Sequence, residues 1–184
     1  MPEELILVDE NDEMIGIIEK MEAHQKALLH RAFSVFIFNS QDEMLLQQRA
    51  IKKYHSGGLW TNACCSHPKP GEETMHGAAR RLREELGFTT ELIKIFDFTY
   101  KHRFENGLTE FEFDHVFVGH YDGEVLPDKD EVGDYCFMSF DEIELSLKSH
   151  PHKFTPWFHI ALPLVKKIIQ DSESKKRSLK INEK

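Results

Sequence analysis

Cysteine, long apolar runs and positive charge are all scarce in this sequence of 184 residues. Its three cysteines are an odd number and two of them are adjacent, which makes a poor disulfide framework and indicates a reducing, cytoplasmic location. No run of 18 apolar residues occurs, so we expect no membrane span. The acidic start Met-Pro-Glu-Glu lacks the basic and then apolar pattern of a signal peptide.

The net charge of −9 argues against nucleic acid or an anionic membrane as the main partner. A small anionic substrate could still bind where basic residues gather locally. With 40% hydrophobic and 30% charged residues, the composition is typical of one globular domain, which we place at residues 1–171. Residues 172–184 are polar and lysine-rich and predict a flexible tail. We expect a monomer, with a weak dimer as the alternative.

The hydrophobic pattern predicts strands, a central helix, more strands and two C-terminal helices. Apolar runs at residues 5–8 and 14–18 flank an acidic turn and predict a hairpin. The continuous apolar run at residues 33–38 predicts a buried strand, and residues 109–119 alternate as a half-buried strand does. Further strands are expected at residues 44–48, 96–100 and 135–138. The fold class is therefore α+β, in the form of a mixed α/β sandwich.

Helical spacing predicts a helix over residues 74–86, with Thr74 as its cap and Gly87 as a left-handed stop. Ser139-Phe-Asp-Glu142 has the pattern of a capping box that opens another helix. Thr155-Pro156 precedes the last predicted helix.

The stretch Trp60-Thr-Asn-Ala-Cys-Cys-Ser-His-Pro68 follows a Gly57-Gly58 turn and ends in a proline. Side chains two residues apart in an extended segment point the same way, so Cys65 and His67 should share a side. Cys64 should point the opposite way, into the core, where free cysteines usually lie. Cys65 is therefore the cysteine to which we assign chemistry.

The predicted helix carries the pattern E-x7-R-x-U-x-E-E-x-G-U, in which U is aliphatic or aromatic, at Glu72, Arg80, Glu84, Glu85 and Gly87. Arg81 and Glu85 lie four residues apart on one helix face. Clustered carboxylates suit Mg²⁺, which takes oxygen ligands and often a substrate diphosphate. Helical periodicity alone favours a charged helix face exposed to solvent. A Mg²⁺ site on this helix therefore needs support from other residues.

Glu110-Phe-Glu112 places two carboxylates on one face of a predicted strand, and His24, His30 and His67 could join them. Three imidazoles and two carboxylates suit a six-coordinate Mn²⁺, Mg²⁺ or Zn²⁺. The spacing does not force these five residues together. A Glu-x-Glu on an alternating strand is usually the solvated face.

The helix pattern resembles the Nudix box, G-x5-E-x7-R-E-U-x-E-E-x-G-U, with two departures. Ser66 replaces the first glycine, and Arg81 replaces the glutamate that follows the arginine. The second change exchanges a metal ligand for a group that binds phosphate. It argues against a hydrolase and leaves diphosphate binding intact.

Several further pieces, in the same order, resemble type 1 isopentenyl-diphosphate Δ-isomerases over residues 3–170. They are Glu22-Ala-His24, His30-Arg-Ala-Phe33, Arg49-Ala50, Gly58-Leu-Trp-Thr-Asn62, Cys65-Ser-His-Pro68, Arg80-Arg81, Glu85-Leu-Gly87, Tyr100, Glu110-Phe-Glu112, Asp130-Glu131-Val132 and Thr155-Pro-Trp157. The resemblance implies the Nudix fold, with a central mixed sheet flanked by helices, an N-terminal hairpin and C-terminal helices. It implies a 1,3-proton shift that interconverts isopentenyl and dimethylallyl diphosphate, a step of isoprenoid biosynthesis.

The resemblance also assigns roles to individual residues. Cys65 and Glu112 are the implied acid–base pair, while Tyr100 hydrogen-bonds Glu112 and the Trp157 ring stabilises a carbocation. The implied ligands of a Mn²⁺, Mg²⁺ or Zn²⁺ ion are His24, His30, His67, Glu110 and Glu112. The diphosphate and its Mg²⁺ are expected on Lys20, Arg49, Lys53, Arg81 and Glu85.

Two alternatives come from other classes. The first is a Nudix pyrophosphohydrolase acting on a nucleoside diphosphate derivative, which would release phosphate from nucleotides. The second is a diphosphate-binding module whose structural metal is held by Cys64, Cys65 and histidines, in which case Cys65→Ser would unfold the protein.

Overall fold

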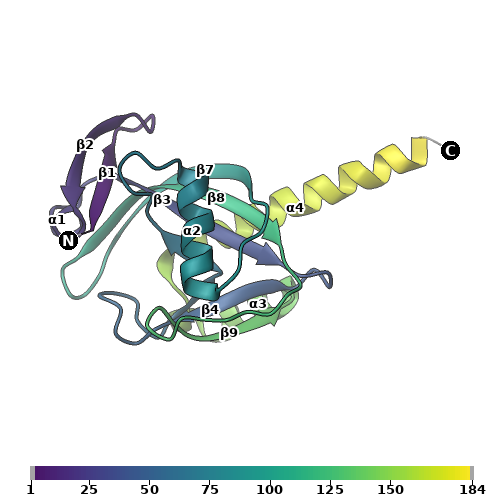
Figure 1. Cartoon of the computed structure of the whole chain (residues 1–184). Helices are drawn as coiled ribbons and strands as arrows, with labels where there is room; N and C mark the ends of the chain where they lie inside the picture. The colour runs from purple at the N-terminus through teal and green to yellow at the C-terminus, as the bar shows by residue number, and fades with distance from the viewer. Residues whose placement is uncertain (1–2, 183–184) are drawn as a thin grey trace.

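The computed structural model describes residues 3–182, with side chains described to Ser172 (Figure 1). The strands are β1 Glu4–Val8, β2 Met14–Glu19, β3 His30–Phe38, β4 Met44–Arg49, β5 Trp60–Asn62, β6 Cys64–Ser66, β7 Ile93–Arg103, β8 Thr109–His120 and β9 Val132–Met138. The helices are α1 Lys20–Lys26, α2 Thr74–Leu86, α3 Phe140–Ser149, the short 3-10 helix η1 Pro151–Lys153 and α4 Pro156–Asn182. All nine strands belong to one sheet.

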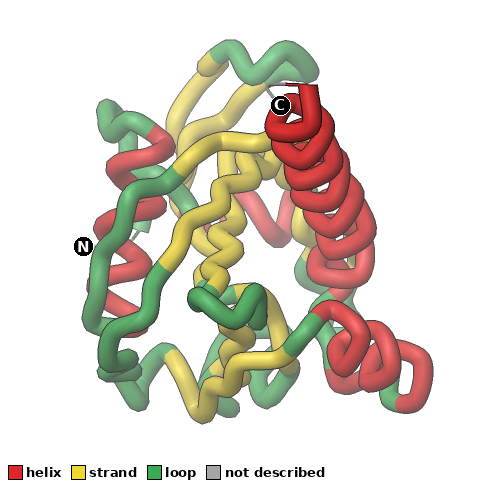
Figure 2. The backbone as a smooth tube through the Cα atoms, turned by 90° about the vertical axis from the view of Figure 1, so that its right-hand side faces the viewer, coloured by secondary structure: helices red, strands yellow, loops and turns green. Residues whose placement is uncertain are grey.

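β3 is the centre of the sheet and is buried on both faces, as its apolar run predicts. It pairs with β8 in parallel and with β1, β4 and β6 antiparallel. Val35 and Ile37 face the core under α2, whereas Phe36 and Phe38 face the core under α3 and α4. Helices therefore cover both sides of the strands (Figure 2), which confirms the predicted α+β sandwich.

The predicted helix at residues 74–86 is present as α2 with the same bounds. It ends at Gly87, whose φ of 79° lies in the left-handed region that glycine adopts most readily. The predicted cap is wrong, because Thr74 is the first helical residue. Glu73 holds the cap position and makes no side-chain bond to the helix.

The predicted capping box of α3 is confirmed: the side chains of Ser139 and Glu142 each bond the other's backbone N–H. α4 continues to Asn182, through the segment from Ser172 that we expected to be flexible, and that flexibility stays a prediction. Among residues 3–182, no helix combines the length and apolar character needed to cross a membrane.

The register of the sheet brings the candidate residues together. The parallel pairing of β3 with β8 sets His30 opposite Glu112. The antiparallel pairing of β3 with β6 sets Ser34 opposite Cys65. The predicted N-terminal hairpin is confirmed as β1 and β2, and it leads directly into α1, which carries His24.

Candidate active site

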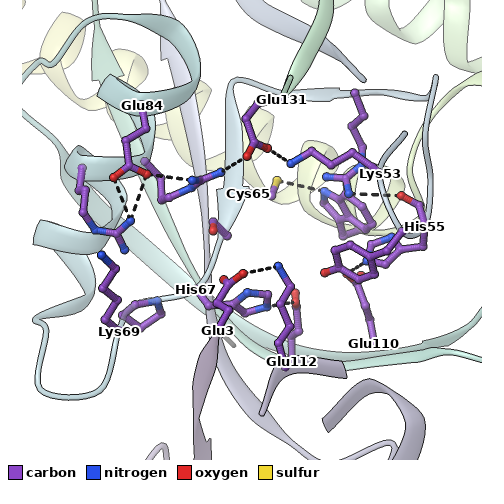
Figure 3. A pocket seen from close by; sticks show the side chains of 18 of the residues that line it. Glu3, Lys53, His55, Cys65, His67, Lys69, Glu84, Glu110, Glu112 and Glu131 are labelled. Atoms are coloured by element: carbon purple, nitrogen blue, oxygen red, sulfur yellow. Dashed lines mark hydrogen bonds and ion pairs between the residues drawn. The ribbon is translucent and has the colours of Figure 1, made fainter. Parts of the chain in front are cut away.

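A cavity of about 250 Å³ opens where β6, β7 and β8 meet α2 and the loop between β4 and β5 (Figure 3). Ten of the predicted site residues line it: Lys20, Arg49, Lys53, Cys65, His67, Arg81, Tyr100, Glu110, Glu112 and Trp157. The other three, His24, His30 and Glu85, are buried and lie behind this lining. Segments far apart in the sequence thus supply one pocket.

Four predicted metal ligands converge. Single donor atoms of His24, His30, His67 and Glu112 all lie within 4.8 Å of one another, and all four residues are buried. Nδ1 of His24 lies 2.7 Å from the carbonyl oxygen of Lys20, and Nδ1 of His30 lies 2.8 Å from that of Leu28. Because a carbonyl only accepts, each Nδ1 carries the hydrogen and each Nε2 keeps its lone pair for the site.

These donors fit a divalent cation. Nε2 of His30 is buried without a hydrogen-bond partner, although a buried polar atom normally has one. Nε2 of His30 and Nε2 of His67 lie 3.6 and 3.0 Å from the same oxygen of Glu112. Burial alone would raise the pKa of Glu112, but these two histidines outweigh it and hold that pKa well below its usual range.

The fifth predicted ligand, Glu110, falls in a different group. Its carboxylate gathers with His24 and with His55, a buried residue that our sequence analysis did not single out. Nε2 of His55 lies 2.7 Å from Oε1 of Glu110. The expected set of five is therefore divided between two groups that share His24. His55 lies in a loop without periodicity, so the sequence offered no signal for it.

Tyr100 joins the two carboxyl groups. Its hydroxyl lies 2.6 Å from Oε2 of Glu110 and 2.7 Å from Oε2 of Glu112. Burial, with the two carboxylates next in effect, raises the pKa of Tyr100 well above its usual value, so the phenol stays protonated. One hydroxyl carries one hydrogen, so Tyr100 donates to one carboxylate and accepts from the other only when that carboxyl is protonated.

Replacing Tyr100 with phenylalanine should lower kcat about 10- to 100-fold, because both carboxyl groups lose the partner that orients them. KM for the substrate should change little, since Tyr100 contacts none of the basic residues. Steady-state kinetics at saturating metal, with thermal unfolding as a check on folding, would test this. A variant with the wild-type kcat would exclude the role.

Cys65 sits in a polar network in the cavity wall. Its thiol donates to Oδ1 of Asn62 at 3.1 Å, and Nε1–H of Trp157 points at the sulfur at 3.1 Å. The Asn62 amide nitrogen donates to the carbonyls of Val35 and Cys64, which fixes its oxygen toward the thiol. Burial raises the pKa of Cys65 to about 12, so the thiol is neutral at pH 7. Cys64 is fully buried in the core under α2, as predicted.

Two residues behind Cys65 were not assigned roles from the sequence. The Ser34 hydroxyl donates to Oδ2 of Asp114 at 2.7 Å and lies 3.5 Å from the Cys65 sulfur. Burial, and then nearby Glu112, raise the pKa of Asp114 well above its usual range. Strand alternation places Asp114 on the same strand face as Glu112, and this sequence pattern could have identified Asp114 as a site residue.

Trp157 contacts Arg49 as well as Cys65. The Arg49 guanidinium carbon lies 5.3 Å from its ring centroid, which is a cation–π contact. Its indole N–H also donates to Oγ1 of Thr61 at 2.9 Å. Trp157 thus orients Arg49 and Cys65, and its predicted contact with a carbocation stays a prediction.

Three basic residues of the cavity, Lys20, Lys53 and Arg81, are paired with carboxylates (Figure 3). Lys20 pairs with Glu3 at 2.9 Å, and Glu131 bridges Lys53 and Arg81, 3.3 Å from the latter. A bound diphosphate would compete with Glu3 and Glu131 for these cations. Burial lowers the pKa of Lys53 to about 8, so its charge needs an anionic partner.

Glu85 already has two partners. Arg81 donates to Oε1 at 2.7 Å and Gln47 to Oε2 at 3.0 Å. Its expected role as a Mg²⁺ ligand stays a prediction.

The histidines give the metal-free fold a pH dependence. Burial, and then nearby His67, lower the pKa of His24 to about 4. In the unfolded chain the pKa of His24 is about 6.5. Between pH 4 and 6.5 the unfolded chain therefore binds a proton at His24 that the folded chain does not bind. In protein stripped with a chelator, the free energy of unfolding should fall by up to about 3 kcal/mol as pH drops from 6.5 to 4. Urea unfolding across this range would test it, and His24→Gln should flatten the curve. If the wild type and His24→Gln lost unfolding free energy equally as the pH falls, His24 would not be the group responsible.

Comparison with known proteins agrees with the fold. Residues 28–158 match the NUDIX domain family, so the chain is a Nudix-domain protein. DR0079 from Deinococcus radiodurans has a similar structure, with a TM-score of 0.67 over 80% of this chain and 90% of that one at 18% identity. A MutT protein from Methanosarcina mazei has a TM-score of 0.63 over 78% and 95% at 19% identity. At these identities the likeness concerns the fold alone.

Sequence relatives are more specific. An isopentenyl-diphosphate Delta-isomerase of Pectobacterium atrosepticum is 52% identical over 85% of this chain and 88% of its own. Those of Aromatoleum aromaticum and Streptomyces avermitilis are 47% and 44% identical, over 90% and 91% of this chain and 87% and 85% of their own. The chain belongs to the isopentenyl-diphosphate Delta-isomerase family.

Proposed function

We propose that this protein interconverts isopentenyl diphosphate and dimethylallyl diphosphate through Cys65 and Glu112. The observation that supports this most directly is that a half-buried thiol and a buried carboxyl group line one cavity that also contains Lys20, Lys53 and Arg81. These cations suit a diphosphate, and the space between them and the acid–base pair suits a short hydrocarbon chain.

The reaction needs an acid and a base on either side of the substrate. One group adds a proton to the terminal CH₂ carbon, and the other removes a proton from carbon 2, so that the double bond moves by one position. An alkene is a weak base, so the acid must be strong, oriented and kept from water. After each turnover the two groups have exchanged protonation states, and proton exchange with solvent restores them.

The chain's own residues prepare Glu112 for this task. Tyr100 holds Oε2, while His30 and His67 face Oε1. When bound by the histidines and glutamates, a divalent cation would make a proton on the remaining oxygen of Glu112 more acidic. We propose Mn²⁺, Mg²⁺ or Zn²⁺ at this position, and Mg²⁺ with the diphosphate near Glu85.

Arg81 argues against hydrolysis of nucleoside diphosphates. It bonds Glu84 at 2.8 Å and Glu85 at 2.7 Å. Its guanidinium therefore neutralises carboxylates that a Nudix hydrolase would offer to metal ions.

Incubating the protein with isopentenyl diphosphate, Mg²⁺ and Mn²⁺ in deuterated water would test the proposal by NMR. We expect dimethylallyl diphosphate to form and deuterium to enter both compounds. A parallel incubation with nucleoside diphosphate derivatives should release no phosphate. Absence of exchange and of product would reject the proposal, and phosphate release would favour the hydrolase.

We also propose a cytoplasmic monomer. Cys64, Cys65 and Cys136 are all free thiols, which suits a reducing compartment.

A further inference from the structure

His55 lies in the loop between β4 and β5, beside the donors that we expect to hold the metal ion. Its side chain is 2% exposed, and that of its neighbour Glu110 is 5% exposed. Nε2 of His55 lies 2.7 Å from Oε1 of Glu110. Despite this short distance, Nε2 makes no hydrogen bond of acceptable geometry and is a buried atom without a partner. Such an atom needs an explanation.

A shared cation explains the spacing. Two ligands about 2.1 Å from one ion and at a right angle to each other are about 3.0 Å apart. The 2.7 Å between His55 and Glu110 is close to this value, as is the 3.0 Å between His67 and Glu112. His67 and Glu112 are also hydrogen-bonded to each other, whereas Nε2 of His55 makes no hydrogen bond and is left for a third partner.

The two donor groups meet at His24. One contains His24, His30, His67 and Glu112, and the other contains His24, His55 and Glu110. Nδ1 of His24 is held by the Lys20 carbonyl, so only Nε2, 3.5 Å from the Tyr54 hydroxyl, can bind an ion. One nitrogen lone pair serves one ion, so the two groups can be filled together only as parts of a single site.

We propose that His55 is a direct ligand of this metal ion through Nε2, and that it joins the site together with Glu110. Four imidazoles and two carboxylates then supply six donors. This inference rests on the proposed function only for the existence of a metal site. It adds a ligand that the sequence pattern did not indicate.

The packing around His55 fixes the ring before metal arrives. Phe104 stacks on it with centroids 4.4 Å apart and planes 11° apart. Trp157 meets it edge-on at 6.0 Å, and Arg49 donates to its backbone carbonyl at 3.3 Å. A ring held by such contacts loses little freedom on binding, which favours a ligand over a surface side chain.

A crystal structure of the full chain grown with Mn²⁺ tests the proposal directly. We expect anomalous scattering from one ion, with Nε2 of His55 at about 2.1 Å from it. An ion bound by the other residues, with His55 donating a hydrogen bond to Glu110 from outside, would overturn this inference and leave the proposed function intact. No ion at all would reject the metal site itself.

Calorimetric titration of Mn²⁺ into chelator-treated protein gives an independent measurement. His55→Gln should weaken binding at least about tenfold. The control is His76→Gln, on the exposed face of α2 and outside the cavity lining, which should bind as wild type does. Wild-type affinity in a folded His55→Gln protein would also overturn the inference. Should that variant fail to fold, the crystal structure of the wild type still decides the question.

Discussion

Replacing Cys65 with serine should lower kcat about 10³- to 10⁴-fold, the upper part of the roughly 10²- to 10⁴-fold that a general acid or base contributes. A serine hydroxyl is a much poorer acid than a thiol. KM should stay close to the wild-type value, because Cys65 contacts none of the cations assigned to the diphosphate. NMR of isopentenyl diphosphate in deuterated water would measure both product and label exchange.

The fold of this variant should be retained. Serine can still donate to Asn62 and accept from Trp157, two of the partners of the Cys65 sulfur. We expect a change of about 1 kcal/mol or less in the free energy of unfolding. Cys136→Ser is the matched control, since Cys136 packs with the opposite core and should keep full turnover. An unfolded Cys65→Ser protein would favour the structural metal site, and an active one would exclude the acid–base role.

The sequence predicts individual segments well because their patterns are local. The apolar run of β3, the spacing of α2 and the stop at Gly87 each depend on neighbouring residues. Alternation also predicted that Cys64 and Cys65 face opposite sides, and the core position of Cys64 confirms it. Such predictions need no knowledge of which segments pair.

The assembly of the site is not local. The parallel pairing that sets His30 opposite Glu112 joins residues 82 positions apart, and no spacing within either strand indicates it. The resemblance to a family supplied that information for most of the site. It did not supply His55, which reaches Glu110 from an irregular loop, or the hydrogen bond from Ser34 to Asp114. These contacts follow from packing rather than from periodicity.

Glu112→Gln should be as damaging as the loss of Cys65, but for two reasons. The amide cannot exchange a proton with the substrate, which should lower kcat about 10³- to 10⁴-fold. It also replaces the oxygen that faces both His30 and His67, so Mn²⁺ should bind more weakly. Titrating Mn²⁺ while measuring turnover separates these effects, because only the second can be overcome by more metal.

Glu110→Gln provides the comparison. Glu110 shares the Tyr100 contact, yet it lies in the other donor group and has no proposed proton-transfer role. At saturating Mn²⁺ we expect Glu110→Gln to recover most of its turnover, whereas Glu112→Gln stays inactive at every metal concentration. If Glu112→Gln also recovered, its carboxyl group would serve only to bind metal, and the acid–base partner of Cys65 would have to be another group in the cavity. Asp114, whose pKa burial raises well above its usual range and which is hydrogen-bonded to Ser34 beside the thiol, would be the next residue to replace.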